Sequence, residues 1–248
     1  MFGLIQKLKG EDLTHEKKRD FRNVVILQIS IIVAALLLKD AFEMSGVENS
    51  YVIRDCIFLL LGGIYVLVMW DMLRNFTQNK IIIYALFLII IGSYILALFI
   101  VNPIFPLYST QKENQPYLFF IHMVLFIIEI TVMYFAILDL FSGNKMSEEK
   151  LWGSTCIFLM IAISFGSLFD LINILSPGAM GTPLSLGLES YTACIAHSLT
   201  VVGAQDSPFP NAISIIKGIS IIESVWANLF IVLLVGRLLG QPDAEKKE

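Results

Sequence analysis

The chain has 248 residues, of which 56% are hydrophobic and 15% are charged, and its formal net charge is −4. Soluble domains carry about 25% charged residues, so this composition excludes an ordinary soluble protein and predicts an integral membrane protein surrounded by the lipid bilayer. The charge balance also provides no basic field for a nucleic-acid partner. The three cysteines lie in apolar runs without C-x-x-C spacing, so we expect buried thiols and neither a disulfide nor a metal site.

The first 22 residues form a polar segment that carries six lysines and arginines. This segment precedes the first apolar run and has no small-x-small cleavage pattern, so a cleaved signal peptide is not expected. Phe2, Leu4, Ile5 and Leu8 are spaced to form one apolar stripe. The sequence is therefore compatible either with a short interfacial helix or with a solvated tail.

Six apolar runs follow, and each is longer than the roughly 17 residues that a bilayer-spanning helix needs. They cover residues 23–42, 52–73, 80–105, 117–141, 151–175 and 212–239. The predicted fold class is thus an all-α membrane protein with six transmembrane helices. No long soluble domain is expected, and the short tail at 241–248 is expected to be disordered.

The loop charges predict the orientation in the membrane. Thirteen lysines and arginines fall in the N-terminal segment, the 74–80 turn, the 142–150 turn and the region after residue 236, and four fall on the other side. The positive-inside rule places both termini in the cytoplasm of a multi-pass plasma (inner) membrane protein.

The fourth run, residues 117–141, contains no arginine, whereas voltage sensors carry several at regular spacing. We therefore expect residues 23–141 to form a four-helix bundle that does not sense voltage. Glu129 lies near the middle of this run. It is either a functional residue, acting as a protonation site that modulates the protein or as a partner for a polar group on a neighbouring helix, or a neutral, hydrogen-bonded packing residue. His122 lies nearer the outer side and is expected to be a satisfied polar residue.

Residues 189–237 differ from the rest of the chain. Residues 189–199 are too few to span a bilayer as a helix, the polar stretch 200–210 contains Gly203, Pro208 and Pro210, and a long apolar run follows. A short helix, a returning loop and a spanning helix together predict a re-entrant pore loop. Irregular backbone at this depth requires burial in protein or contact with a water-filled cavity.

This stretch resembles the pore module of the potassium-channel superfamily, whose filters have the pattern T-T-V-G-Y-G-D. The chain has T-V-V-G-A-Q-D at residues 200–206, and Thr200, Val202, Gly203 and Asp206 match. The stretches E-S-V-W-A-N-L-F at 223–230 and L-L-V-G-R-L at 233–238 are similar to inner helices of bacterial two-helix pores. The resemblance covers about a fifth of the chain.

The resemblance implies a homotetramer that passes monovalent cations, K⁺ or Na⁺, without a cofactor or an enzymatic activity. Residues 147–240 would form the pore domain, with its outer helix, pore helix, filter and inner helix. Backbone carbonyls would line a filter; the residues concerned are Thr200, Val201, Val202, Gly203, Ala204 and Gln205. Asp206 and Glu223 would support the pore mouth, Asn228 would line the cavity or bond another helix, and Val232, Leu233 and Val235 would form a hydrophobic gate.

Three departures from the family pattern bear on selectivity. Val201 replaces the threonine that offers a hydroxyl to the inner ion site, Ala204 replaces the tyrosine, and Gln205 replaces the second glycine. A glycine reaches positive φ without a Cβ clash, so we expect Gln205 to be strained in a family-like filter. The sequence therefore predicts fewer ordered ion sites and weaker discrimination of potassium from sodium.

Three alternatives remain open. Residues 189–210 could form a hairpin that only dips into the interface, the protein could be a non-conducting pore-like subunit, or it could be an intramembrane hydrolase, although no G-x-S-x-G elbow occurs. Cys194 and His197 are three residues apart, but two ligands do not make a metal site, and His197 is expected to pack behind the filter. The sequence indicates no particular soluble partner.

Overall fold

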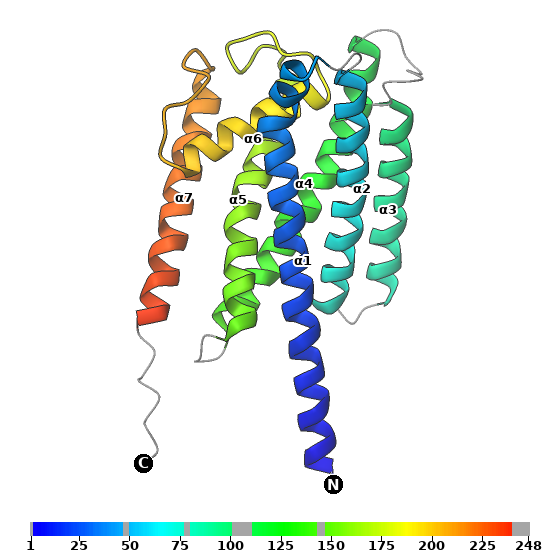
Figure 1. The fold of residues 1–248 in the computed structure, drawn as a ribbon, viewed down its shortest axis with the longest axis vertical. Coiled ribbons are helices and arrows are strands. Elements are labelled where there is room, and N and C mark those ends of the chain that lie inside the picture. Colours follow the sequence, from blue (N-terminus) through cyan, green and yellow to red (C-terminus); the bar gives the residue numbers. More distant parts are fainter. Residues whose placement is uncertain (1, 47–49, 77–79, 101–110, 143–146, 240–248) are drawn as a thin grey trace.

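The computed structural model of the protein describes residues 2–46, 50–76, 80–100, 111–142 and 147–239. In these residues the regular secondary structure consists of seven helices (Figure 1). They are α1 (Phe2–Met44), α2 (Ser50–Phe76), α3 (Lys80–Ile100), α4 (Gln111–Phe141), α5 (Glu148–Leu175), α6 (Leu188–Val202) and α7 (Ser214–Leu239). All but α6 are long enough and apolar enough to cross a bilayer, which confirms the predicted all-helical architecture with six candidate spans.

The N-terminal segment is part of a longer helix. It does not form a separate short helix, because α1 runs without a break from Phe2 through the first apolar run. Residues 2–22 contain no proline and are rich in good helix formers such as Lys, Glu, Gln and Leu, so the helix has no reason to end. Figure 1 shows the N-terminal part of α1 extending beyond the other helices.

The fifth helix is the centre of the packing. α5 contacts α1, α4, α6 and α7, and it is the most buried of the six candidate spans. α7 is the least buried span and lies on one side of the molecule, while α2 and α3 lie on the opposite side (Figure 1). The fully buried apolar core lies between the two groups, and includes Val24, Met69, Val132, Ala136 and Ile157.

Polar contacts join several helices at the end of the molecule where α1 begins and α7 finishes. Lys17 Nζ lies 2.6 Å from an Asp139 carboxylate oxygen, which links α1 to α4. Lys18 Nζ lies 2.7 Å from a Glu148 carboxylate oxygen, which links α1 to α5. The Arg237 guanidinium donates to the Ser142 carbonyl at 3.1 Å, so the end of α7 is held near the α4–α5 turn. Lys17, Lys18 and Arg237, three of the basic residues that predict the orientation, therefore share one end of the fold.

Some sequence expectations need correction at this level. α3 ends at Ile100, and the predicted continuation of this run to residue 105 lies outside the described residues, as does the tail at 241–248. The thiols of Cys156 and Cys194 are buried as expected. The expectation was wrong for Cys56, which is exposed on α2, where an apolar helix needs no protein neighbour if lipid surrounds it.

Candidate functional site

The site centres on α6, a 15-residue helix between α5 and α7. At 1.5 Å per residue it is roughly 22 Å long, shorter than the roughly 30 Å hydrocarbon core of a bilayer. Figure 1 shows α6 running obliquely toward α7, with its C-terminal end lower along the long axis than its N-terminal end. The chain then returns to the same end of the fold, where α7 begins.

A glycine on α5 allows α6 to approach closely. A Cβ atom added at Gly166 would lie only 2.9 Å from the Cα and Cγ1 atoms of Ile195. Both residues are buried, and the nearest obstacle is partly backbone, which a side-chain rotation does not move. The α5–α6 contact therefore depends on the missing side chain at position 166.

The end of α6 differs from the predicted filter. The helix continues past the expected end at Leu199, so Thr200, Val201 and Val202 are helical. The Thr200 carbonyl accepts from the Gln205 N–H at 2.8 Å, and the Val201 carbonyl accepts from the Ala204 N–H at 3.1 Å. Within one chain, continued helical bonding is the available way to satisfy these carbonyls.

The turn that follows α6 contains one strained backbone position. Ala204, at φ 52°, is the one non-glycine residue with positive φ in the described part of the chain, whereas Gln205 lies outside that region. Ala204 follows the Gly203 cap, where helices commonly place a glycine in the left-handed conformation. Gly203 itself has φ −77°. The left-handed conformation therefore falls at Ala204, and Gln205 is not strained.

His197 joins α6 to the returning loop and to α7. Its Nε2 atom lies 3.0 Å from Ser220 Oγ, and its Nδ1 atom lies 3.1 Å from Ser207 Oγ. Ser220 Oγ donates to the Ile216 carbonyl, and Ser207 Oγ accepts from the Phe209 N–H. These roles fit a neutral ring that donates through Nε2 and accepts through Nδ1.

The ring of His197 also packs edge-on against two aromatic rings, Phe169 on α5 and Phe209 in the loop. Burial lowers the pKa of His197 below its usual value of 6.5, which favours the neutral form. Both ring nitrogens are bonded to serines, so no carboxylate orients the ring as a hydrolase triad requires. His197 therefore has the geometry of a structural link behind the loop.

A buried carboxyl on α7 supports α6. Glu223 is completely buried, and its carboxyl contacts the Ser198 hydroxyl on α6. The same hydroxyl lies 2.6 Å from the Ala162 carbonyl of α5. A serine hydroxyl has one proton, so a bond donated to Ala162 leaves Glu223 as the donor in the second contact. This arrangement assigns a proton to Glu223 and ties together α5, α6 and α7.

A second polar chain connects the four-helix bundle to the start of α6. One Asp170 carboxylate oxygen on α5 contacts His122 Nδ1 on α4, and the other accepts from Ser190 Oγ on α6 at 2.5 Å. The Asn173 amide donates to Ser190 at 2.9 Å and accepts from the Gly178 N–H at 3.2 Å. Sequence reasoning missed this chain, because its bonded side-chain pairs are 17 to 48 residues apart and follow no periodic signal.

Glu129 has a hydrogen-bonding neighbour on another helix, which both interpretations of this residue allow. Its carboxylate is completely buried on α4 and accepts from the Ser167 hydroxyl of α5 at 2.9 Å. Its other oxygen has no hydrogen-bond partner among the described residues. The contact links α4 to α5 at the level of the core and leaves a protonation role as a prediction.

The remaining predicted site residues are exposed in the single chain. Asp206 lies in the loop after α6, and Asn228 lies near the middle of α7. The three proposed gate residues are also exposed on α7; they are Val232, Leu233 and Val235. None of them packs inside its own chain, as expected for groups that face lipid, water or another copy.

Within the described residues no group of three or more His, Cys, Asp or Glu side chains is placed to hold a metal ion, and Cys194 and His197 do not form such a group. Comparison of the chain with protein-family models, with curated proteins and with solved structures gives no match. The geometry around α6 is therefore the available basis for assigning a function.

Proposed function

We propose that four copies of this chain assemble around a common axis and pass monovalent cations, K⁺ or Na⁺, across the membrane. The observation that carries this proposal is the path of the chain after α5. A helix too short to span runs obliquely, ends beside α7 part-way along the long axis, and is followed by a loop that returns to the start of a spanning helix. Such a path fits a re-entrant pore loop, because irregular backbone at membrane depth is stable when it lines a water-filled cavity.

The exposed amide of Asn228 supports the same assembly. It is near the middle of α7, which is otherwise apolar around this position, and it is directed away from its own chain. An amide that faces lipid leaves its hydrogen-bonding groups unsatisfied, whereas an amide that faces water or a neighbouring helix does not. In the proposed tetramer α7 is the inner helix, and Asn228 faces the cavity.

The backbone after α6 sets the expected selectivity. The carbonyls of Thr200 and Val201 accept hydrogen bonds from their own chain. No hydrogen bond to the carbonyl of Gly203, Ala204 or Gln205 occurs in the described part of the chain. The proposed filter is therefore short, and fewer carbonyls replace the hydration shell of the ion than in a full filter. Weak discrimination between K⁺ and Na⁺ follows.

A second candidate function is a non-conducting, pore-like subunit that acts through assembly. The helical hydrogen bonds of Thr200 and Val201 favour it, because a carbonyl inside a helix does not coordinate a permeant ion. In this case the four loops would meet without forming a continuous path.

Ion flux separates the two functions. Purified protein is reconstituted in vesicles, and uptake of Rb⁺, Na⁺ and Cl⁻ is measured against empty vesicles. The channel predicts Rb⁺ and Na⁺ uptake of similar size without Cl⁻ uptake. The non-conducting subunit predicts no uptake above the empty vesicles.

Two variants, each with one introduced cysteine and each in its own protein, locate the ion path in the same assay. In a Cys56→Ser background, a charged thiol reagent is expected to block flux through Asn228→Cys. The control is Gly92→Cys, on the exposed side of α3, where the reagent is expected to have no effect. Block at both positions or at neither would contradict a path along α7.

A further inference from the structure

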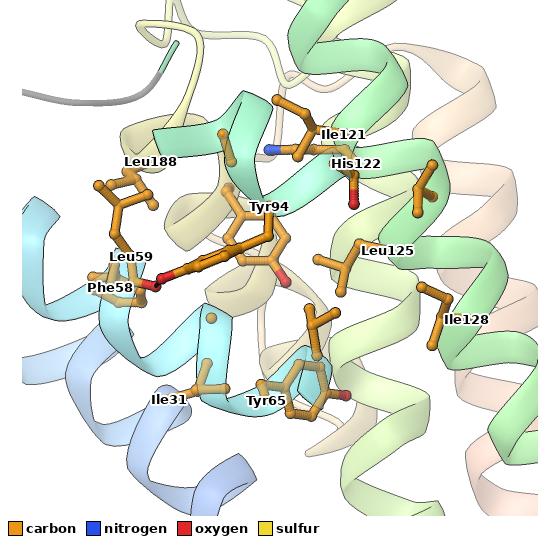
Figure 2. Close-up of a pocket in the computed structure, with 16 residues that line it drawn as sticks. Ile31, Phe58, Leu59, Tyr65, Tyr94, Ile121, His122, Leu125, Ile128 and Leu188 are labelled. Atoms are coloured by element: carbon orange, nitrogen blue, oxygen red, sulfur yellow. Dashed lines mark hydrogen bonds between the residues drawn. The ribbon is translucent and has the colours of Figure 1, made fainter. Parts of the chain in front are cut away.

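A cavity of about 120 Å³ lies inside the four-helix bundle, away from α7 and the returning loop (Figure 2). Most of its wall residues come from α2, α3 and α4. One further wall residue comes from α1, and two come from the first turn of α6. Apolar side chains make up most of the lining, among them Ile31, Phe58, Val66, Leu125 and Ile128. Figure 2 shows His122 near one end of the cavity and Tyr65 near the other.

Few polar groups line the cavity, and the groups described next are hydroxyls and one histidine. Ser93 Oγ donates to the Ile90 carbonyl at 2.8 Å, and Tyr94 Oη donates to the Leu59 carbonyl at 3.1 Å, so both hydroxyl protons are used by the backbone. The Nδ1 atom of His122 contacts a carboxylate oxygen of Asp170. Among the residues that the structure describes, no lysine, arginine or carboxylate lines the space. A ligand for this cavity must therefore be uncharged and largely apolar.

The volume limits the ligand to a small molecule. An engineered apolar cavity of about 150 Å³ remains dry and binds benzene or xenon. The present cavity, at about 120 Å³, is of similar size and is also mainly apolar. It accommodates one aromatic ring or a short hydrocarbon chain.

The two α6 residues give the cavity a connection to the candidate pore. Leu188 and Tyr191 close it from the α6 side. The Tyr191 ring packs edge-on against His122 at 5.2 Å between ring centroids. His122 is joined through Asp170 to Ser190, the residue before Tyr191. A molecule in the cavity therefore touches both ends of this link.

We propose that this cavity is a binding site for a small, uncharged, lipid-soluble molecule of the size of one aromatic ring, and that its occupancy acts on the first turn of α6. The proposal of a binding site depends only on the cavity and not on the proposed channel function. The effect on α6 rests on the proposed channel function, since it would change ion flux. Because the walls belong to spanning helices, the ligand enters from the lipid phase.

Two adjacent glycines on α2, Gly62 and Gly63, differ in the space beside them, and this difference selects the variant to test. A Cβ added at Gly63 would lie 2.4 Å from the Tyr94 ring, so Gly63 is needed for that wall of the cavity. A Cβ added at Gly62 meets nothing within 4 Å, and Gly62 lines the cavity. Gly62→Leu therefore fills the space without a collision at its first atom. Gly92→Leu is the matched control, because Gly92 is also in open space but is exposed on α3.

The probe is 3-trifluoromethyl-3-phenyldiazirine, an uncharged single-ring photolabel, applied to the full protein in phosphatidylcholine vesicles. Labelled residues are mapped by mass spectrometry, with benzyl alcohol as competitor. We expect saturable, competitor-sensitive labelling of Tyr65, Tyr94 or Tyr191 in the wild type and in Gly92→Leu. In Gly62→Leu we expect this labelling to fall about tenfold, because a leucine side chain occupies most of the space.

Unchanged labelling in Gly62→Leu would overturn the site, as would wild-type labelling that is not saturable and falls only on exposed residues such as Leu88 and Ile89. If Gly62→Leu does not fold, Ala97→Leu fills the same cavity from α3 and gives the same expectation. Flux is measured in parallel: benzyl alcohol should change Rb⁺ uptake in the wild type and not in the filled variant. Labelling without any flux would remove the channel proposal and leave the binding site in place.

Discussion

Ala204 is held in a conformation that suits a different residue. Its positive φ of 52° lies in the left-handed region, which costs an L-residue about 1–2 kcal/mol relative to glycine. The position directly follows the Gly203 cap at the end of α6. The strain is thus a feature of this chain and of its helical ending.

Replacing Ala204 by glycine is expected to raise the free energy of unfolding by up to about 1 kcal/mol, because relief of the strain exceeds the added flexibility of the unfolded chain. Thermal unfolding followed by tryptophan fluorescence measures the change. The control is Ala193→Gly inside α6, which should lower stability by about 1 kcal/mol. A loss of stability in both variants would show that Ala204 is not strained.

His197 should make stability depend on pH. Its pKa is lowered by burial, so the folded protein keeps the ring neutral while the unfolded chain takes up a proton below about pH 6.5. The free energy of unfolding should therefore be steady above pH 7 and fall as the pH drops from 6.5 toward the lowered value. Melting temperatures at pH 8 to pH 5 are compared with those of His197→Gln, which should show a weaker decline. Parallel declines would assign the pH dependence to other groups.

Contacts between α5, α6 and α7 decide how firmly the candidate pore helix is held. The Glu223 carboxyl, the Ser198 hydroxyl and the Ala162 carbonyl form one connected set across the three helices. A carboxyl that donates a proton here is neutral, which removes the large cost of burying a charge. The set then acts as a hydrogen-bonded brace.

The brace predicts different results for two substitutions of Glu223. Glu223→Gln keeps a donor and nearly the same shape, so its stability should stay within about 1 kcal/mol of the wild type. Glu223→Ala leaves the Ser198 hydroxyl without this contact and opens a space, and it should cost about 2–4 kcal/mol. Thermal unfolding in the same detergent compares the three proteins. A Gln variant as unstable as the Ala variant would mean that Glu223 carries a needed charge.

The close contact of α5 with α6 makes a prediction against helix propensity. Alanine is a better helix former than glycine by about 1 kcal/mol, so Gly218→Ala on α7, where a Cβ meets open space, should be neutral or stabilising. Gly166→Ala places its Cβ 2.9 Å from backbone of Ile195 and should destabilise by about 1–3 kcal/mol. Equal effects of the two variants in thermal unfolding would contradict the packing described for α6.

The spanning helices are predictable from sequence because each requires only a long apolar run, and that requirement is local. The bounds of α5 and α7 fall within a few residues of the expected ones. The end of α6 is less predictable, since Thr200 and Val201 satisfy their carbonyls in the helix, whereas a family-like filter would extend them. The same holds for Asp170, whose neighbours His122 and Ser190 come from two other helices and become visible only when the helices pack.

At the scale of the whole molecule, one chain leaves much of α7 without protein contacts. The candidate gate residues and Asn228 are exposed, although α7 continues directly from the candidate pore loop. The four-helix bundle lies on the other side of α5, joined to it through Glu129 and Asp170. In a tetramer this arrangement places α7 at the centre and the bundles at the periphery.

An electron cryomicroscopy map of the protein in lipid nanodiscs would show whether four copies surround one ion path. We expect a fourfold axis, with the segment Gly203–Ala204–Gln205 of each copy facing it and with density on the axis when K⁺ is present. Asn228 should face the same axis below this segment. A monomer or dimer, or an oligomer whose four α6 helices lie apart at its outer edge, would contradict the account.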